Sequence, residues 1–385
     1  MTPIEHIVKS ISLAPHLDDA NLPSDDEWEK IAVVAIAVGL APLLHQHLIQ
    51  TDLVLPPMAK AKLAVLRKAH AKRNQEIANQ LAEVLAACAQ NNIDVLVLKG
   101  ALLAPTVYAD PALRPMNDID LLFREESIAR AESVLEGLGY AGKHKDADQG
   151  PGVVKHLSTY RREGNEGATP NPYISANADR MVEPHVSLEE AWFGLKVDIT
   201  PGVWERAVPI VLHNQPAFRL STIDLLIHLA VHATFHVIMG SSVFLQLYDI
   251  GQVVQTMADE IAWTEVLEHT RQAKAEAFTY AGFYWAKALY QAAIPEDVLA
   301  TLKEACSPDL VAYVQSLDAT GLLTRTQHPP LITFKQRLQR GLLDRKEAAR
   351  WADSLSAKWN IWQTALTFYK TDTMHLLKQS LKSEA

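Results

Sequence analysis

Two aspartates separated by one apolar residue, Asp118 and Asp120, are the residues of this sequence best suited to chemistry. The apolar residues around them predict a buried strand over 118–123, and side chains at positions i and i+2 of a strand share one face. Adjacent carboxylates repel each other unless a cation lies between them, and Mg²⁺ or Mn²⁺ prefers such oxygen ligands. A solvated strand edge is the alternative, but carboxylates beside a core are costly without a partner. The pair therefore predicts a metal site for phosphoryl or nucleotidyl transfer.

A third carboxylate would complete such a metal site and accept the proton of the attacking group. The two candidates are Glu183 and Asp198, each of which lies in a short apolar run typical of a strand. We favour Glu183 and keep Asp198 as the alternative. Pro184 follows Glu183 and has no N–H to donate to a neighbouring strand, so we expect the strand at 181–186 to lie at an edge of its sheet.

Residues suited to binding phosphate follow a predicted first strand at 93–98, where the sequence reads Lys99-Gly100. Glycine lets the backbone approach a phosphate, a helix that begins there points its N–H groups at the anion, and lysine adds positive charge. We predict that Lys99 and Gly100 bind a nucleoside triphosphate; the alternative is a plain strand-to-helix turn. Arg114 is equally suited to neutralising phosphate charge and to a salt bridge that holds the connector.

Three histidines, His228, His232 and His236, recur every fourth residue and so share one stripe of a predicted helix. Histidines at this spacing can bind zinc, but Leu229 stands where an HExxH motif has its glutamate. We interpret the histidines as structural or hydrogen-bonding groups, and we expect Asp249 to be the partner of one of them.

The elements that position these residues divide the chain into three regions. Residues 1–90 have helical periodicity, residues 91–205 contain strand-like runs and a helix pattern at about 126–138, and residues 206–385 are helical again. We predict an α+β fold, in which a small mixed-sheet catalytic core is flanked by N-terminal and C-terminal helical domains. Residues 141–180 are rich in Gly, Asp, Asn and Pro, which predicts a long irregular loop that acts as a lid.

The composition is that of an ordinary globular protein, with 48% hydrophobic and 21% charged residues among 385. A net charge of −9 argues against a nucleic-acid partner. The two cysteines, Cys88 and Cys306, form no CxxC pair, and the N-terminus lacks a signal-peptide pattern, so we expect a reducing, cytoplasmic location. No run of about 18 apolar residues occurs, so we expect no membrane partner.

These motifs carry a family resemblance. The segment 97–100, Tyr108, Arg114 and the segment 118–122 resemble a bacterial family of uncharacterised nucleotidyltransferases in the DNA polymerase β-like superfamily, and the similarity extends from about residue 25 to 300. The resemblance implies a nucleotidyltransferase fold that binds a nucleoside triphosphate such as ATP with magnesium. It implies that Asp118 and Asp120 are the metal-binding pair and that Glu183 is the third carboxylate.

The leading functional hypothesis is transfer of a nucleoside monophosphate from an NTP to a hydroxyl or phosphate of an acceptor, with release of pyrophosphate. Relatives of this family lie among genes for ribosomally made, modified peptides, so the resemblance admits a peptide as well as a small-molecule acceptor. Ala101 stands where the superfamily usually has serine. This difference motivates a second hypothesis, a non-catalytic nucleotide-sensing or partner-binding protein on the same fold. A third hypothesis is kinase-like transfer of the γ-phosphate.

Overall fold

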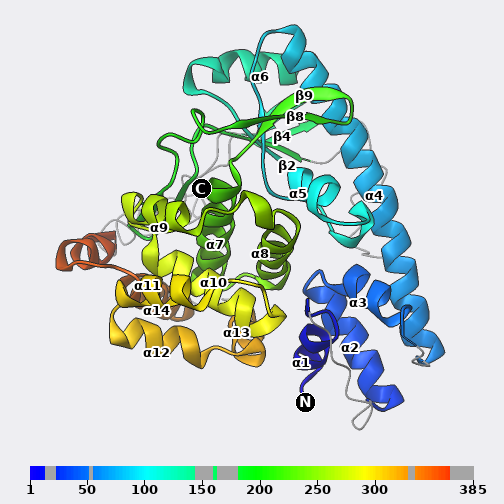
Figure 1. Cartoon of the computed structure of the whole chain (residues 1–385), viewed down its shortest axis with the longest axis vertical. Coiled ribbons are helices and arrows are strands. Elements are labelled where there is room, and N and C mark those ends of the chain that lie inside the picture. Colours follow the sequence, from blue (N-terminus) through cyan, green and yellow to red (C-terminus); the bar gives the residue numbers. More distant parts are fainter. Residues whose placement is uncertain (14–22, 52–54, 144–158, 163–180, 328–333, 365–385) are drawn as a thin grey trace, which may run out of the picture.

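A mixed sheet lies at one end of the molecule and most of the helices at the other (Figure 1). The computed structural model describes residues 1–13, 23–51, 55–143, 159–162, 181–327 and 334–364. The architecture agrees with the predicted α+β class, because a mixed sheet is combined with many helices.

The N-terminal region is helical, as its periodicity predicts. Ser24 caps one helix by donating its backbone N–H to Glu27 Oε2 at 2.8 Å. The longest described helix buries an apolar stripe, has Asn91 as its C-cap and runs alongside the sheet down to the other N-terminal helices (Figure 1). The helices described in this region are α1 (Pro3–Ser10), α2 (Asp25–Ala37), α3 (Ala41–Leu48) and α4 (Pro57–Gln90).

Within the described residues, seven strands form the main sheet, in the order β3-β4-β5-β2-β1-β9-β8. The sheet is mixed, because β2 pairs with β5 in parallel and with β1 in antiparallel fashion, whereas β1 and β9 are parallel. The α-helices that the structure describes in this part of the chain are α5 (Lys99–Val107) and α6 (Ile128–Gly137). The strands are β1 (Leu96–Val97), β2 (Asp118–Leu122), β3 (Tyr140–Lys143), β4 (Thr159–Arg162), β5 (Met181–His185), β8 (Val208–Leu212) and β9 (Gln215–Arg219).

The sheet differs from expectation at β5, which lies between β4 and β2 and not at an edge. The expectation was wrong, because in the described residues β4 pairs with β5 at one position, Tyr160 with Val182. Pro184 lies outside this β4–β5 ladder, so its missing N–H removes no hydrogen bond between these two strands. The sheet also extends past the predicted core boundary at residue 205, since β8 and β9 join it. The lid predicted over 141–180 lies outside the described residues at 144–158 and 163–180.

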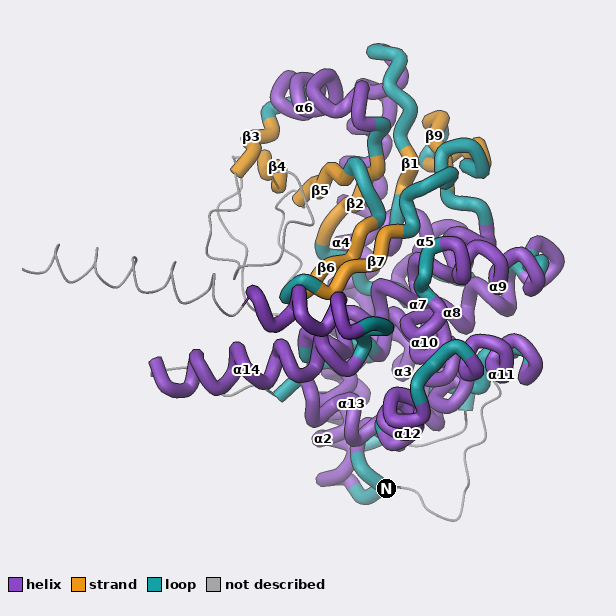
Figure 2. The backbone as a smooth tube through the Cα atoms, turned by 90° about the vertical axis from the view of Figure 1, so that its left-hand side faces the viewer, coloured by secondary structure: helices purple, strands orange, loops and turns teal. Residues whose placement is uncertain are grey.

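A second, two-stranded sheet is formed by β6 (Glu189–Trp192) and β7 (Leu195–Asp198). This hairpin lies between the main sheet and the helices, where β6 contacts α7 (Figure 2). The position matters for the site, because β6 carries a buried glutamate, Glu190, to the helix that holds the histidine stripe.

The C-terminal helices pack around α7 (Thr222–Met239), which is almost entirely buried. Gly282 lets α10 approach closely, because a Cβ there would lie 2.8 Å from the Ala230 backbone of α7. Among the described helices α7 alone is long and apolar enough to cross a membrane, and 89% of it is buried inside the protein. The others are α8 (Phe244–Thr256), α9 (Trp263–Gln272), α10 (Glu276–Tyr290), α11 (Glu296–Glu304), α12 (Pro308–Ser316), α13 (Ala319–Arg325) and α14 (Phe334–Arg350).

Candidate active site

A cavity of about 440 Å³ lies where the main sheet meets α7 and α8. Its volume is in the range of sites for small ligands and cofactors. It collects six of the predicted site residues together with two histidines of α7. The residues that line it include Lys99, Gly100, Arg114, Asp118, Asp120, Glu183, His232, His236 and Asp249.

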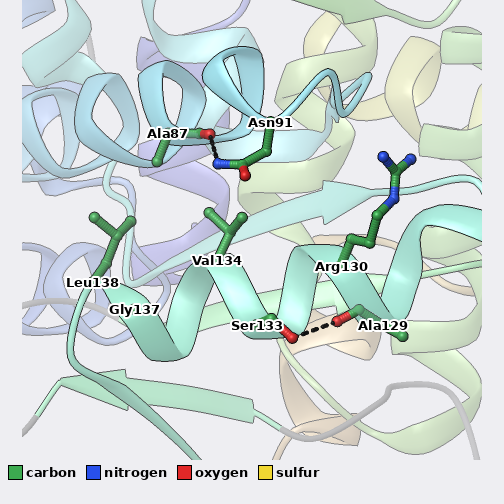
Figure 3. A pocket seen from close by; sticks show the side chains of 8 residues that line it. All are labelled: Ala87, Asn91, Ala129, Arg130, Ser133, Val134, Gly137 and Leu138. Atoms are coloured by element: carbon green, nitrogen blue, oxygen red, sulfur yellow. Dashed lines mark hydrogen bonds between the residues drawn. The ribbon is translucent and has the colours of Figure 1, made fainter.

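A larger cavity of about 730 Å³ lies between α4 and α6 (Figure 3). Its polar side chains include Asn91 and Ser133, which donate to the carbonyl groups of their own helices, at Ala87 and Ala129. Such local hydrogen bonds leave no set of groups converging on a ligand. The smaller cavity is therefore the better candidate, because charged and titratable groups meet there.

The acidic pair lies on β2 and is completed by the neighbouring strand β5. The register places Asp120 beside Glu183 and Leu122 beside His185. Asp120, Glu183 and His185 can each offer a ligand atom, and these atoms lie within 4.8 Å of one another. The carboxylate oxygens of Asp120 and Glu183 suit a divalent cation, and His185 holds Asp120 through a hydrogen bond.

Asp198, the alternative third carboxylate, is not brought to this site. It lies on the β6–β7 hairpin, is exposed, and accepts a hydrogen bond from the backbone N–H of Thr200 at 2.9 Å. It does not line the cavity that contains the acidic pair. The parallel pairing of β2 with β5 is what selects Glu183 as the neighbour of Asp120.

Buried Asp120 accepts hydrogen bonds from a half-buried lysine and a buried histidine. Lys99 Nζ donates to Asp120 Oδ1 at 2.7 Å, and His185 Nε2 donates to the same oxygen at 2.9 Å. Burial alone would raise the pKa of Asp120, but the charge of Lys99 and the hydrogen bond from His185 hold that pKa well below its usual range. Burial and the charge of Asp120 instead raise the pKa of Asp118 to about 6.

Lys99 and Gly100 lie where β1 passes into α5. Lys99 has a left-handed backbone with φ of 44°. Burial would lower the pKa of its amine, but Asp120, Glu190 and Asp118 outweigh that effect and raise it. A Cβ at Gly100 would lie 2.4 Å from Arg114 Nη1, so the absence of a side chain there makes room for the Arg114 guanidinium.

Arg114 forms the salt bridge that was one of its two predicted roles. Its Nε donates to Asp249 Oδ1 at 2.9 Å, and its Nη2 donates to Asp249 Oδ2 at 2.7 Å. Tyr108 also donates to Asp249 Oδ1, at 2.6 Å. The expectation that Asp249 partners a histidine is therefore wrong: its hydrogen bonds join the connector before β2 to α8. This buried pair holds the sheet against the C-terminal helices.

Two residues of the histidine stripe line the cavity, which the sequence analysis did not predict. His232 Nδ1 donates to Glu190 Oε1 at 2.8 Å, and His236 Nδ1 donates to the carbonyl of Ser242 at 3.1 Å. Glu190 was missed altogether. The signal in the sequence was a glutamate within an apolar run, but only the packing of β6 on α7 shows its partner.

Comparisons with known proteins give one extensive match. Residues 24–291, which are most of the chain, match the model of a family described as uncharacterised nucleotidyltransferase. No curated protein matches the sequence.

Two solved structures are similar over part of the chain. One is a crystal structure of ANT(2'')-Ia in complex with adenylyl-2''-tobramycin, with 12% identity and a TM-score of 0.35 over 51% of this chain and 97% of that one. The other is a solution structure of the antibiotic-resistance factor ANT(2'')-Ia, with 15% identity and a TM-score of 0.29 over 51% of this chain and 96% of that one. The family match carries the identification, because it covers most of the sequence.

Proposed function

This chain belongs to the family of uncharacterised nucleotidyltransferases and is a transferase enzyme, and we propose that it transfers a nucleoside monophosphate from an NTP to an acceptor in a reaction that needs Mg²⁺ or Mn²⁺. Pyrophosphate is the second product. One observation carries the proposal: Asp118, Asp120 and Glu183 meet on two adjacent parallel strands at the wall of a cavity large enough for a nucleotide.

The proposed metal ligands are the three carboxylates. Oxygen ligands from Asp118, Asp120 and Glu183 suit a hard divalent cation. Burial and then the charge of Asp120 raise the pKa of Asp118, and a bound cation would offset both effects. A bound divalent metal supplies charge neutralisation for the triphosphate and for the transition state of phosphoryl transfer.

The proposed triphosphate ligand is Lys99. Its ammonium group lies at the cavity wall, 2.7 Å from Asp120, so it already faces the position where phosphate charge and metal would meet. Arg114 supports the site in a different way, because Asp249 engages its Nε and Nη2 and thereby fixes the connector that leads into β2. Gly100 accommodates that guanidinium.

The acceptor is proposed to be a molecule with a free hydroxyl or phosphate. The described residues contain no feature that favours a peptide over a small molecule, so the test includes both. The alternative functions, nucleotide sensing without turnover and transfer of the γ-phosphate, make different predictions about products.

The test uses each of the four NTPs labelled at the α-phosphate, with Mg²⁺ or Mn²⁺ and either small-molecule or peptide extracts as acceptors. Wild-type protein is compared with Asp118→Asn/Asp120→Asn and with Asp198→Asn as the matched carboxylate control. We expect labelled product and pyrophosphate from the wild type and the control, and none from the double variant. Transfer by the double variant would refute the proposed function, and ADP as the product would favour γ-phosphate transfer. Metal-dependent NTP binding without product would favour nucleotide sensing.

A further inference from the structure

A buried glutamate and a buried histidine form a pair beside the cavity that contains the carboxylates of the sheet, and the histidine lines that cavity. Glu190, on β6, is 2% exposed, and His232, on α7, is 7% exposed. The distance from His232 Nδ1 to Glu190 Oε1 is 2.8 Å. His232 lines the same cavity as Asp118, Asp120 and Glu183. Buried charged groups are rare without a specific partner, so this pair calls for an explanation.

The β6–β7 hairpin that carries Glu190 is held in place by the C-terminal part of the chain. Arg345 of α14 lies over the ring of Phe193 at 4.5 Å from its centroid. Gly194 packs against the backbone at Asn360, where a Cβ would lie 3.3 Å from the carbonyl oxygen. These contacts position Glu190 from outside the main sheet.

The hydrogen bond determines which nitrogen of His232 is basic. A carboxylate can only accept, so Nδ1 carries the proton that it donates to Glu190, and Nε2 is then the nitrogen that can accept a proton. A carboxylate partner also stabilises the imidazolium that forms and fixes the orientation of the ring. Hydrogen-bonded pairs of this kind are suited to general-base catalysis.

We propose that His232 Nε2 accepts the proton of the acceptor hydroxyl, with Glu190 as its positioning residue. This inference rests on the proposed function and deepens it. Glu183 was predicted from the sequence to accept this proton, but a carboxylate that ligates a divalent metal is a weaker base than one that does not. In this proposal the carboxylates of the sheet bind the metal, and a histidine of α7 is the general base.

The step is balanced. The acceptor oxygen forms a bond to the α-phosphorus of the NTP, and the bond from that phosphorus to the bridging oxygen breaks, so that pyrophosphate leaves. The hydroxyl proton moves to His232 Nε2, and the resulting imidazolium later releases it to solvent. The acceptor and the NTP thus become the nucleotidylated acceptor and pyrophosphate.

His236 is the competing candidate, since it lies one turn further along α7 and lines the same cavity. Its Nδ1 donates to the backbone carbonyl of Ser242, which carries no full charge, so an imidazolium there is less stabilised than at His232. The rings of His228 and His236 lie 5.8 and 4.5 Å from the ring of His232. The other charged groups that face the same cavity are Lys99, Arg114, Asp118, Asp120, Glu183 and Asp249.

The first test uses ATP labelled at the α-phosphate, with Mg²⁺ and glycerol as the hydroxyl probe, from pH 5.5 to 9. We expect His232→Gln to lower the rate of adenylyl transfer about 10²-fold or more while leaving Mg·ATP affinity unchanged. Glu190→Gln should shift the acidic limb of the pH–rate profile down by about one pH unit, because the imidazolium loses its negative partner. His6→Gln, in the remote helix α1, is the matched control and should behave as wild type.

Several results would overturn the inference. One is a His232→Gln variant that transfers adenylate at the wild-type rate and keeps the acidic limb of the pH–rate profile. Another is loss of the acidic limb in His236→Gln or in Glu183→Gln while His232→Gln behaves as wild type. A separate result would contradict the proposed function itself: adenylyl transfer by the Asp118→Asn/Asp120→Asn variant.

A second measurement needs no acceptor. ¹⁵N NMR of the imidazole rings, assigned with His232→Gln, reports which nitrogen carries the proton at neutral pH. We expect the Nδ1–H form at His232, with Nε2 titrating, and loss of that preference in Glu190→Gln. An Nε2–H form in the folded wild type would overturn the assignment even where glycerol is not a substrate.

Discussion

Replacing Asp118 with asparagine should stabilise the metal-free protein at neutral pH, although it removes a proposed metal ligand. Burial and the charge of Asp120 raise the pKa of Asp118 from 3.8 to about 6. A carboxyl group whose pKa is higher in the folded than in the unfolded state opposes folding once it is ionised. Its cost is absent below pH 3.8, grows as the pH rises from there to about 6, and is complete above pH 6.

The size of the effect follows from the pKa. A difference of roughly two units corresponds to about 3 kcal/mol of unfolding free energy at pH 7.5. At pH 5 the expected gain is about half as large, because the folded carboxyl is then largely protonated, and near pH 3.8 it is close to zero. Asparagine has nearly the same shape and carries no charge, so packing changes contribute little to the difference.

The assay is urea unfolding followed by tryptophan fluorescence, with EDTA present, for the wild type and Asp118→Asn at pH 7.5 and pH 5. Adding Mg²⁺ should stabilise the wild type and not the variant, since a ligand that binds only the folded state stabilises it. A variant that is less stable than the wild type at pH 7.5 in EDTA would refute the reasoning. So would a gain that is the same at both pH values.

The remaining predictions concern the supports of the site. Asp249→Asn leaves the Arg114 guanidinium buried without its charge partner and should lower the unfolding free energy by about 3–5 kcal/mol in urea titrations; a loss below about 1 kcal/mol would contradict the role given to this pair. Gly100→Ala should lower the unfolding free energy by about 1–3 kcal/mol, because the new methyl group would lie 2.4 Å from a guanidinium nitrogen that Asp249 holds in place; unchanged stability would show that Arg114 can move. Asp198→Asn should change the rate of transfer by no more than about twofold, whereas Glu183→Gln should reduce that rate severely. Equal losses of rate in the two variants, measured side by side, would contradict the proposal that Glu183 is the third carboxylate.

The features that the sequence determined by itself are local ones. Asp118 and Asp120 share a face because strand geometry alternates side chains over two residues, whatever the strand packs against. The cap at Ser24 and the apolar stripe of α4 also depend on neighbours within a few positions along the chain. A mixed-sheet core with helices on either side followed from these periodicities, and the motif around the two aspartates was enough to indicate the family.

The tertiary structure decided everything that depends on which distant segments meet. Parallel pairing of β2 with β5, and not any property of Glu183 itself, places Glu183 beside Asp120, whereas Asp198 lies on the β6–β7 hairpin. Arg114 donates to Asp249, which lies 135 positions away in the sequence, and His232 donates to Glu190, which lies 42 positions away. Periodicity shows which side of a helix is apolar but not which wall of a cavity that side forms. The role of the α7 histidines therefore became visible only once the β6–β7 hairpin and the sheet were packed against that helix.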